Sequence, residues 1–286
     1  LKPYQDRVRG TYDLLHTTLS LAGAYADTLK AMRNNTLEAY APSAYYPLTW
    51  QVDSTAYQVL KFKGFRADTI PSVATGQPRL KYDRDEPVTS DVRYFNQFRA
   101  VDSVRIPQAY VVPRAWGQIR DRLDWNGITY RELDRDTTLE VTAYRIVDFQ
   151  TYSRPYEGHY PHYKTSVSRT TRAIRFRAGD LYIPTGQEGV RYLLETMEPQ
   201  AVDSFFNWNF FDSILQRKEG FSPYVFEDTA TALLQEDSLL RREFESKKRD
   251  EPEFAASGYR QLSWLYERSP HFEAAYLQYP VYRLEL

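Results

Sequence analysis

The chain has 286 residues, 42% of them hydrophobic, which is enough for one large core or two ordinary ones. Its 37 basic and 38 acidic residues nearly balance, which excludes the positive field that attracts nucleic-acid phosphates. Cysteine is absent, which excludes disulfides, thiolate nucleophiles and zinc sites built on sulfur. No apolar run approaches the roughly 20 residues that cross a bilayer, so we predict no membrane span.

The first predicted element is a helix over residues 4–32. Its apolar side chains recur at steps of three and four, as on one face of an amphipathic helix. They are Val8, Tyr12, Leu15, Leu19, Ala22, Ala26 and Leu29. The pair Asn34–Asn35 is expected to end the helix, and Ala41–Ser43 is typical of a connection. We therefore predict a boundary near residue 42, with residues 1–41 and 42–286 as separate modules.

A β-rich stretch is predicted from about residue 48 to residue 112. Runs of strand-forming residues such as Tyr57–Phe62 are separated there by glycine and proline, a pattern typical of short strands and turns. The separating residues are Gly64, Pro71, Gly76, Pro78 and Pro87. Ala109–Val112 predicts a further strand at the end of this stretch.

One strand-helix-strand unit is predicted next. Trp116, Ile119 and Leu123 share one helical face after the Ala109–Val112 strand, and Asn126–Gly127 is suited to end that helix. Ile128–Leu133 then resumes an extended pattern.

Two more strand patterns follow. Thr137–Phe149 predicts a long strand whose alternation changes phase between Val141 and Tyr144, as at a β-bulge. Arg172–Arg177 and Leu181–Pro184 lie on either side of a turn and predict a hairpin.

Beyond Gly189 the pattern becomes helical. Asp203 or Ser204 is suited to cap a helix that reaches Leu215. Further helices are predicted over about residues 237–248 and 252–268, and Tyr279–Leu284 is typical of a closing strand. The predicted fold class is therefore α+β: an N-terminal helix, a mostly antiparallel β region at 42–186 with one strand-helix-strand unit, and a helical C-terminal third at 187–286.

The sequence lacks the common signatures of nucleophilic catalysis and phosphate binding. It has no Gly-x-Ser-x-Gly, no glycine-rich loop followed by Lys-Ser or Lys-Thr, and no Gly-x-Gly-x-x-Gly. A glycosidase with paired carboxylates stays open, because 38 acidic residues always contain some pair and the sequence selects none.

His159 and His162 are spaced closely enough to raise the question of a shared metal. Pro155, Gly158 and Pro161 disfavour a helix there, and on a strand this spacing points the two rings to opposite faces. A shared metal would need an irregular loop, so the favoured interpretation is two histidines with ordinary hydrogen bonds.

The same segment supplies the candidate binding residues. Arg154, Tyr156, Glu157 and His159 combine different polar types between two strand patterns, which indicates a recognition loop for a peptide or a carbohydrate. The alternative, which the sequence favours, is a buried polar network that fixes a corner of the fold. No catalytic or metal-ligating residue is assigned in this chain.

Several segments in the same order resemble the C-terminal region of large bacterial zinc carboxypeptidases of the carboxypeptidase A-like family. They are Arg154–His159, Gly179–Thr185, Leu193–Gln200, Trp208–Asp212 and Tyr279–Arg283. The likeness spans almost the whole chain. It implies that residues 1–41 are the last helix of a peptidase domain and that residues 42–286 are an accessory module packed on it.

The resemblance also implies a zinc-dependent parent whose catalytic residues lie upstream of this chain. Carboxypeptidase A-like sites take two zinc ligands from a His-x-x-Glu turn, and none of His16, His159, His162 and His271 begins one. We therefore expect zinc in the parent and none bound here, with the upstream peptidase domain as partner and a peptide as possible substrate. The parent is expected to be secreted or periplasmic, although the sequence as given opens with no signal peptide.

Overall fold

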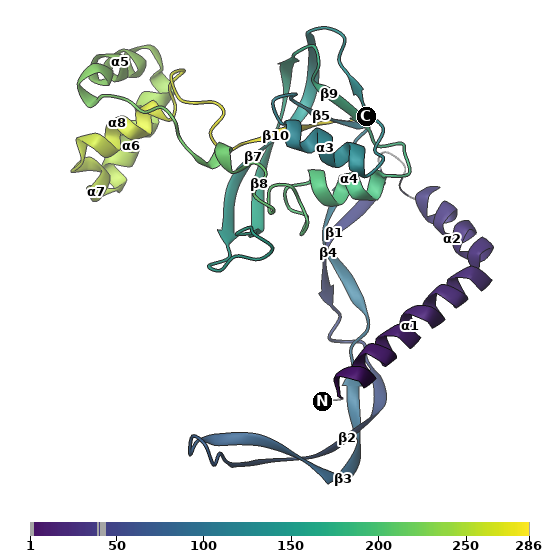
Figure 1. Ribbon diagram of the computed structural model, residues 1–286. Coiled ribbons are helices and arrows are strands. Elements are labelled where there is room, and N and C mark those ends of the chain that lie inside the picture. Colours follow the sequence, from purple (N-terminus) through teal and green to yellow (C-terminus); the bar gives the residue numbers. More distant parts are fainter. Residues whose placement is uncertain (1–2, 39, 41–43, 286) are drawn as a thin grey trace. The chain divides into compact units, whose positions relative to one another are not determined.

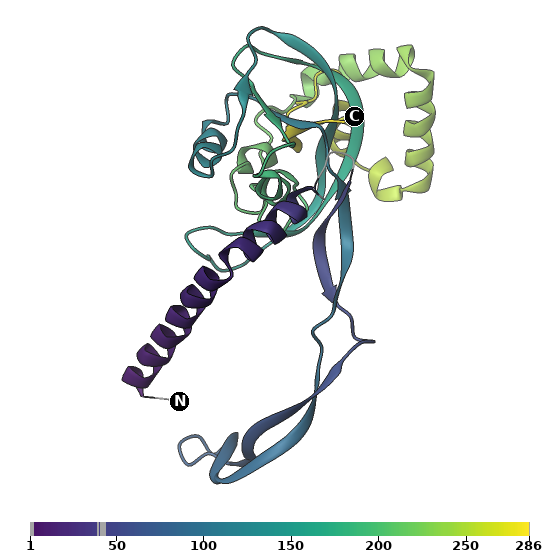
Figure 2. The same ribbon diagram turned by 90° about the vertical axis from the view of Figure 1, so that its right-hand side faces the viewer.

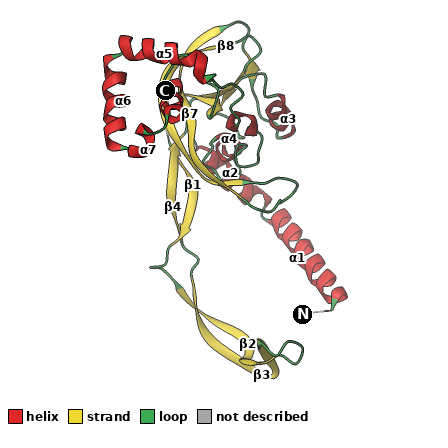
Figure 3. Ribbon diagram, turned by 90° about the vertical axis from the view of Figure 1, so that its left-hand side faces the viewer, coloured by secondary structure: helices red, strands yellow, loops and turns green. Residues whose placement is uncertain are grey.

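The computed structural model describes residues 3–38, 40 and 44–285. These residues form helices and antiparallel sheets, so the fold class is α+β, as predicted (Figure 3). The chain divides into two compact units, one formed by Ala44–Ile106 and the other by the rest. The predicted module boundary near residue 42 lies outside the described residues.

The N-terminal segment forms two helices, α1 (Tyr4–Ala24) and α2 (Ala26–Glu38), where the sequence predicts one (Figure 1, purple). The prediction that Asn34–Asn35 ends the helix is wrong, since both residues lie inside α2. Asparagine costs a helix interior only a few tenths of a kcal/mol, and α2 contains no glycine or proline to add to that cost. Neither helix has a buried residue among those described.

Residues 44–106 form two antiparallel strand pairs (Figure 3). The strands β1 (Tyr45–Val52) and β4 (Phe98–Arg105) make one pair, and β2 (Gln58–Pro71) and β3 (Pro78–Tyr94) make the other.

Two predicted interruptions in this unit are wrong, because Gly64 lies inside β2 and Pro87 lies inside β3. A two-stranded ribbon has an open edge on each strand, where proline needs no hydrogen-bonding partner. The register shifts directly after the pair Phe65–Pro87, so a local irregularity accommodates the proline within one continuous ribbon.

The other unit contains a six-stranded antiparallel sheet in the order β6-β9-β5-β10-β7-β8. Its strands are β5 (Ala109–Val112), β6 (Arg131–Glu132), β7 (Thr137–Thr151), β8 (His162–Phe176), β9 (Leu181–Pro184) and β10 (Gln278–Leu284). The closing strand β10 runs between β5 and β7 in the middle of the sheet, so the end of the chain completes the core.

The predicted helix between β5 and β6 is present as α3 (Gly117–Trp125). Ile119 and Leu123 are buried, and Gly127 has a φ of 63°, which suits the turn after the helix. In the sheet, β9 lies between β5 and β6, so the two strands of this unit are not neighbours.

The predicted hairpin of Arg172–Arg177 with Leu181–Pro184 is wrong. β8 pairs with β7, whereas β9 pairs with β5 and β6 at the other end of the sheet. The turn itself exists, with Gly179 at a φ of 85°. The Asp180 carboxylate accepts the backbone N–H groups of Arg114 and Arg177, which ties the turn to the residues after β5.

The change of phase in β7 is not a bulge beside β8, but the register of β7 with β10 does shift between Ala143 and Arg145. The register of β7 with β8 is unbroken from Thr137 to Ile146, and the irregularities follow at Asp148. Val141 and Tyr144 are both buried because they point to opposite faces of the sheet, and each face is covered there. The apolar residues at both odd and even positions of β7 here indicate a strand that is buried on both faces.

After β9 comes α4 (Val190–Met197), but the predicted helix from residue 203 to 215 is wrong. Residues 201–211 form successive turns, and only the short 3-10 helix η1 (Asp212–Leu215) follows. Ser204 does accept the N–H of Asn207, as a cap would, but Asn209 has a φ of 67°, which ends any helix after one turn.

The remaining helices form a core of their own (Figure 2). They are α5 (Pro223–Glu236), α6 (Ser238–Asp250), α7 (Pro252–Ala255) and α8 (Gly258–Tyr266). Phe226, Phe244 and Leu265 are among the buried side chains that they share. The helix predicted over 252–268 is therefore two helices, since the Ser257 side chain caps α8. No helix among the described residues has the length and apolarity that a membrane span requires.

Candidate functional site

The predicted binding loop is the tight turn that connects β7 to β8. Tyr156 and His159 exchange both backbone hydrogen bonds, with N···O distances of 2.8 and 2.9 Å. Between them Glu157 and Gly158 have φ values of 48° and 79°. Two central residues with positive φ are what a two-residue type I′ hairpin turn requires, so the chain reverses within the predicted loop.

The four candidate residues lie on the surface of this turn. Arg154, Tyr156 and Glu157 are exposed, and His159 is partly exposed. Neither Arg154 nor Glu157 forms an ion pair with any residue that the structure describes. The alternative of a buried polar network therefore does not describe these side chains.

Aromatic side chains from a distant segment lie against the turn. The His159 ring meets Trp208 edge-on at a centroid distance of 5.5 Å and stacks on Phe210 at 6.3 Å. Tyr156 lies 6.2 Å from the Trp208 ring. We call Tyr156, His159, Trp208 and Phe210 the aromatic tip. Tyr156 is 61% exposed and the other three are partly exposed, so the cluster presents ring surface to solvent.

His162, directly behind the aromatic tip, is buried and fully engaged. Its Nδ1 lies 2.8 Å from Thr151 Oγ1, and its Nε2 lies 3.1 Å from Asp212 Oδ1. Phe149 and Phe206 lie against the ring at centroid distances of 4.7 and 5.0 Å. His159 faces Trp208 instead, so the two histidines do not converge on a common point.

The contacts of His162 position the segment that carries Trp208. The His162 backbone N–H donates to the Asn207 carbonyl, and the Asn209 amide donates to the carbonyl of Tyr160. The 207–212 segment is thereby tied to the start of β8. We interpret His162 as the residue that holds the aromatic tip together, because both of its ring nitrogens already have partners.

The most heavily buried charges lie elsewhere, where the sheet meets the end of α4. Glu198 accepts hydrogen bonds from Arg283, from the Tyr110 hydroxyl at 2.5 Å and from the Tyr144 hydroxyl at 3.1 Å. Burial, and next the charge of Glu198, raise the pKa of Tyr110 well above its usual value and also raise that of Tyr144. Every polar atom of Glu198 has a partner, so the cluster stabilises the fold and has no free group for chemistry.

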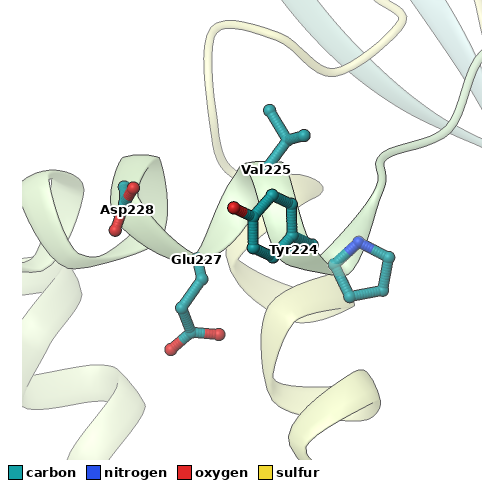
Figure 4. Close-up of a pocket in the computed structure, with 5 residues that line it drawn as sticks. Tyr224, Val225, Glu227 and Asp228 are labelled. Atoms are coloured by element: carbon teal, nitrogen blue, oxygen red, sulfur yellow. The ribbon is translucent and has the colours of Figure 1, made fainter.

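No described group of three or more histidine, cysteine, aspartate or glutamate side chains is arranged to hold a metal ion. A shallow surface depression lies at the start of α5, lined by Pro223, Tyr224, Val225, Glu227 and Asp228. Figure 4 shows Val225 and Glu227 pointing to opposite sides of this turn.

Sequence reasoning missed the contribution of residues 207–212 to the site. Trp208 and Phe210 fall inside the helix predicted to reach Leu215, and an aromatic residue on a helix usually serves the core. The available signal was the density of Asn and Asp around the aromatics, because these residues favour turns and the left-handed conformation found at Asn209.

Comparisons of the chain with protein-family models, with curated proteins and with solved structures found no match. The likeness to zinc carboxypeptidases therefore stays a hypothesis that rests on the sequence segments alone.

Proposed function

We propose that this chain is the C-terminal accessory module of a secreted or periplasmic bacterial zinc metallocarboxypeptidase. The parent protein would remove C-terminal residues from peptides, using a zinc-bound water held by an upstream peptidase domain. This chain would contribute no zinc ligand and no general base. Its role would be to stabilise that domain and to shape its substrate cleft.

The observation that carries the proposal is the apolar stripe of α1. Val8, Tyr12, Leu15 and Leu19 recur at helical spacing, and they are 51%, 64%, 58% and 73% exposed. Burying a leucine side chain stabilises a protein by about 1.5–3 kcal/mol, so a long stripe left in water is a strong reason to expect a partner. An upstream domain that ends in this helix would cover the stripe.

The proposal is tested on the native polypeptide, recovered from its source with an antibody against this chain. Intact mass, zinc content and release of C-terminal residues from a peptide are measured on the same sample. We expect a mass above the 33.6 kDa of this chain and about one zinc per molecule. The release of residues should stop when a chelator removes the zinc. A native polypeptide of 33.6 kDa without zinc and without hydrolysis would overturn the proposal.

A second candidate function is non-catalytic binding of a carbohydrate or a peptide, and the aromatic tip favours it. Ring faces exposed beside mixed polar groups are typical of surfaces that stack against sugar rings or aromatic side chains. Arg154 and Glu157 flank the rings without an ion-pair partner among the described residues, so their hydrogen-bonding groups are free for a ligand.

Calorimetric titration with soluble polysaccharides and with extended peptides tests this second function. Replacing the stacking ring in Trp208→Ala should weaken binding about tenfold, in line with the energy of an aromatic pair. Trp50→Ala is the matched control, because Trp50 is 59% exposed on β1, in the other compact unit. Equal affinities of the two variants would exclude the aromatic tip as the binding surface.

A further inference from the structure

A recess of about 310 Å³ opens on the face of the six-stranded sheet opposite to Glu198. Tyr282 of β10 pairs with Val111 and Ala143, whereas its neighbour Arg283 points to Glu198 on the other face. Arg172 pairs with Val141 and therefore shares the face of Tyr282. We call this depression the Arg172 recess.

The walls of the Arg172 recess are apolar and aromatic. Ile214 and Pro280 are buried, and Trp116 and Tyr282 are partly buried. Pro113, Ala274 and Ala275 complete the apolar lining. Burial raises the pKa of the Tyr282 hydroxyl, and the charge of Arg172 opposes that rise, so Arg172 is close enough to act on this wall. A volume of this size is at the lower end of small-ligand pockets.

One wall is held in place by hydrogen bonds to backbone carbonyls. Arg145 donates to the carbonyls of Tyr276 and Ala274 at 2.6 and 3.2 Å, and the Leu277 N–H donates to the Ile214 carbonyl at 2.8 Å. Segments that are far apart in the sequence, by 131 residues for Arg145 and Tyr276, are thereby joined around the recess. The depression is formed by ordered backbone and does not depend on a ligand to shape it.

The charge at the rim is not neutralised. Arg172 Nη2 donates to Gln278 Oε1 at 2.8 Å, and no carboxylate among the described residues pairs with Arg172. Gln278 is itself fixed by donating to the Tyr144 carbonyl. The remaining N–H groups of the guanidinium can donate hydrogen bonds to an anion at the edge of this apolar recess.

We propose that the Arg172 recess binds a carboxylate carried on an apolar or aromatic body. One planar guanidinium matches the two oxygens of a carboxylate, and the apolar walls match a ring or a branched side chain next to it. A cation is disfavoured by the charge of Arg172. This site is independent of the proposed carboxypeptidase parent and of the aromatic tip.

The test is an NMR titration of the complete, isotopically labelled chain with N-acetyl-phenylalanine and with its amide. The acid should shift the resonances of Trp116, Ile214, Ala275 and Tyr282 with an affinity on the order of 1 mM, as expected for a small ligand at an open site. The uncharged amide should bind at least about tenfold more weakly, because it forfeits the charge-assisted hydrogen bonds. Equal binding of acid and amide would overturn the proposal.

Two variants separate the roles of charge and shape. Arg172→Gln should weaken binding of the acid about tenfold or more. Arg175→Gln on the same strand should leave that affinity unchanged, since Arg175 pairs with Asp136 outside the recess. Ala275→Phe, at an exposed position, should fill the recess and abolish binding with Arg172 intact. Retained binding in Arg172→Gln or in Ala275→Phe would refute the assignment.

The source of the carboxylate is distinguished with two further probes. A peptide that ends in phenylalanine with a free carboxylate should bind like the acid if the recess receives chain termini. Binding of N-acetyl-phenylalanine but not of this peptide would identify a free apolar acid as the ligand. If neither probe shifts the recess resonances, the proposal is refuted.

Discussion

Arg283, on the last strand, donates a hydrogen bond to Glu198 at the end of α4, and the two side chains are only 3% and 2% exposed. Taking two charges out of water costs several kcal/mol per ion, which the pair recovers only with good geometry and further hydrogen bonds. The Tyr110 and Tyr144 hydroxyls donate such bonds to Glu198, and the Glu285 carboxylate accepts one from Arg283. The pair thus joins β10 to α4 at the centre of the sheet.

Glu198→Gln should reduce the free energy of unfolding by about 3–5 kcal/mol, because it removes the carboxylate charge that is paired with the buried Arg283 guanidinium. Urea unfolding followed by circular dichroism measures the loss. Glu253→Gln is the matched control, since its pair with Arg260 is exposed and should contribute no more than about 1 kcal/mol.

The double variant Glu198→Leu with Arg283→Met is the companion test. It removes both charges and keeps apolar volume, so it should be more stable than Glu198→Gln alone. A loss below about 1 kcal/mol for Glu198→Gln would contradict the view that this pair is a central contact of the fold.

The chain should lose stability steeply at alkaline pH. Burial, and next the charge of Glu198, raise the pKa of Tyr110, Tyr144 and Tyr279 above the usual value of 10.0. Their folded-state pKa lies above the unfolded one, so their contribution is complete below about pH 10 and is lost as the pH rises beyond it. Each such tyrosine should add a slope of about 1.4 kcal/mol per pH unit.

Urea unfolding at several alkaline pH values, with tyrosinate absorbance at 295 nm, measures this effect. Tyr144→Phe should reduce the slope by about 1.4 kcal/mol per pH unit, which corresponds to one proton. Tyr224→Phe, at a residue that is 91% exposed, should leave the slope unchanged. Ionisation of all tyrosines before unfolding would show that the Glu198 cluster admits water.

Elements of the fold could be predicted from the sequence where the pattern lies in neighbouring residues. The order of strands in the sheet could not, because it depends on residues far apart in the chain. Local patterns predict the apolar stripe of α1, the turn at Gly127 and the closing strand. They do not predict the placement of β9, because the turn at Gly179 looks the same whether β9 returns beside β8 or crosses to β5. Contacts with distant residues distinguish the two, among them the Asp180 contact with the Arg114 backbone, which spans 66 residues.

The site shows the same division. Arg154–His159 was singled out because its polar residues are consecutive, and the structure places them on one turn. Trp208 and Phe210 join that turn through His162 and Asn209, across about 50 residues of sequence. The Arg172 recess is still less visible, because its lining comes from four separate segments whose residues look like ordinary core in sequence.

Gly158→Ala should destabilise the chain by about 1 kcal/mol. A Cβ at this position would meet no atom within 4 Å, so the cost comes from the φ of 79° and not from a clash. Glu157→Asn should stabilise the chain by about a few tenths of a kcal/mol, because asparagine adopts positive φ more readily in a type I′ turn. Thermal unfolding of the two variants measures both effects, and a stabilising Gly158→Ala would contradict the turn geometry.

The α1 stripe should be expendable in the isolated chain and essential in the proposed parent. Leu15→Glu with Leu19→Glu replaces side chains that are 58% and 73% exposed, so unfolding of the isolated chain should change by less than about 0.5 kcal/mol. In the parent the same pair would place two charges in a buried interface, which should lower its midpoint temperature or separate the module from the peptidase domain. Asp13→Asn with Thr17→Gln, on the same helix but off the stripe, is the control. Calorimetry and sedimentation of both proteins measure the outcome, and a destabilised isolated chain would show that the stripe already packs within it.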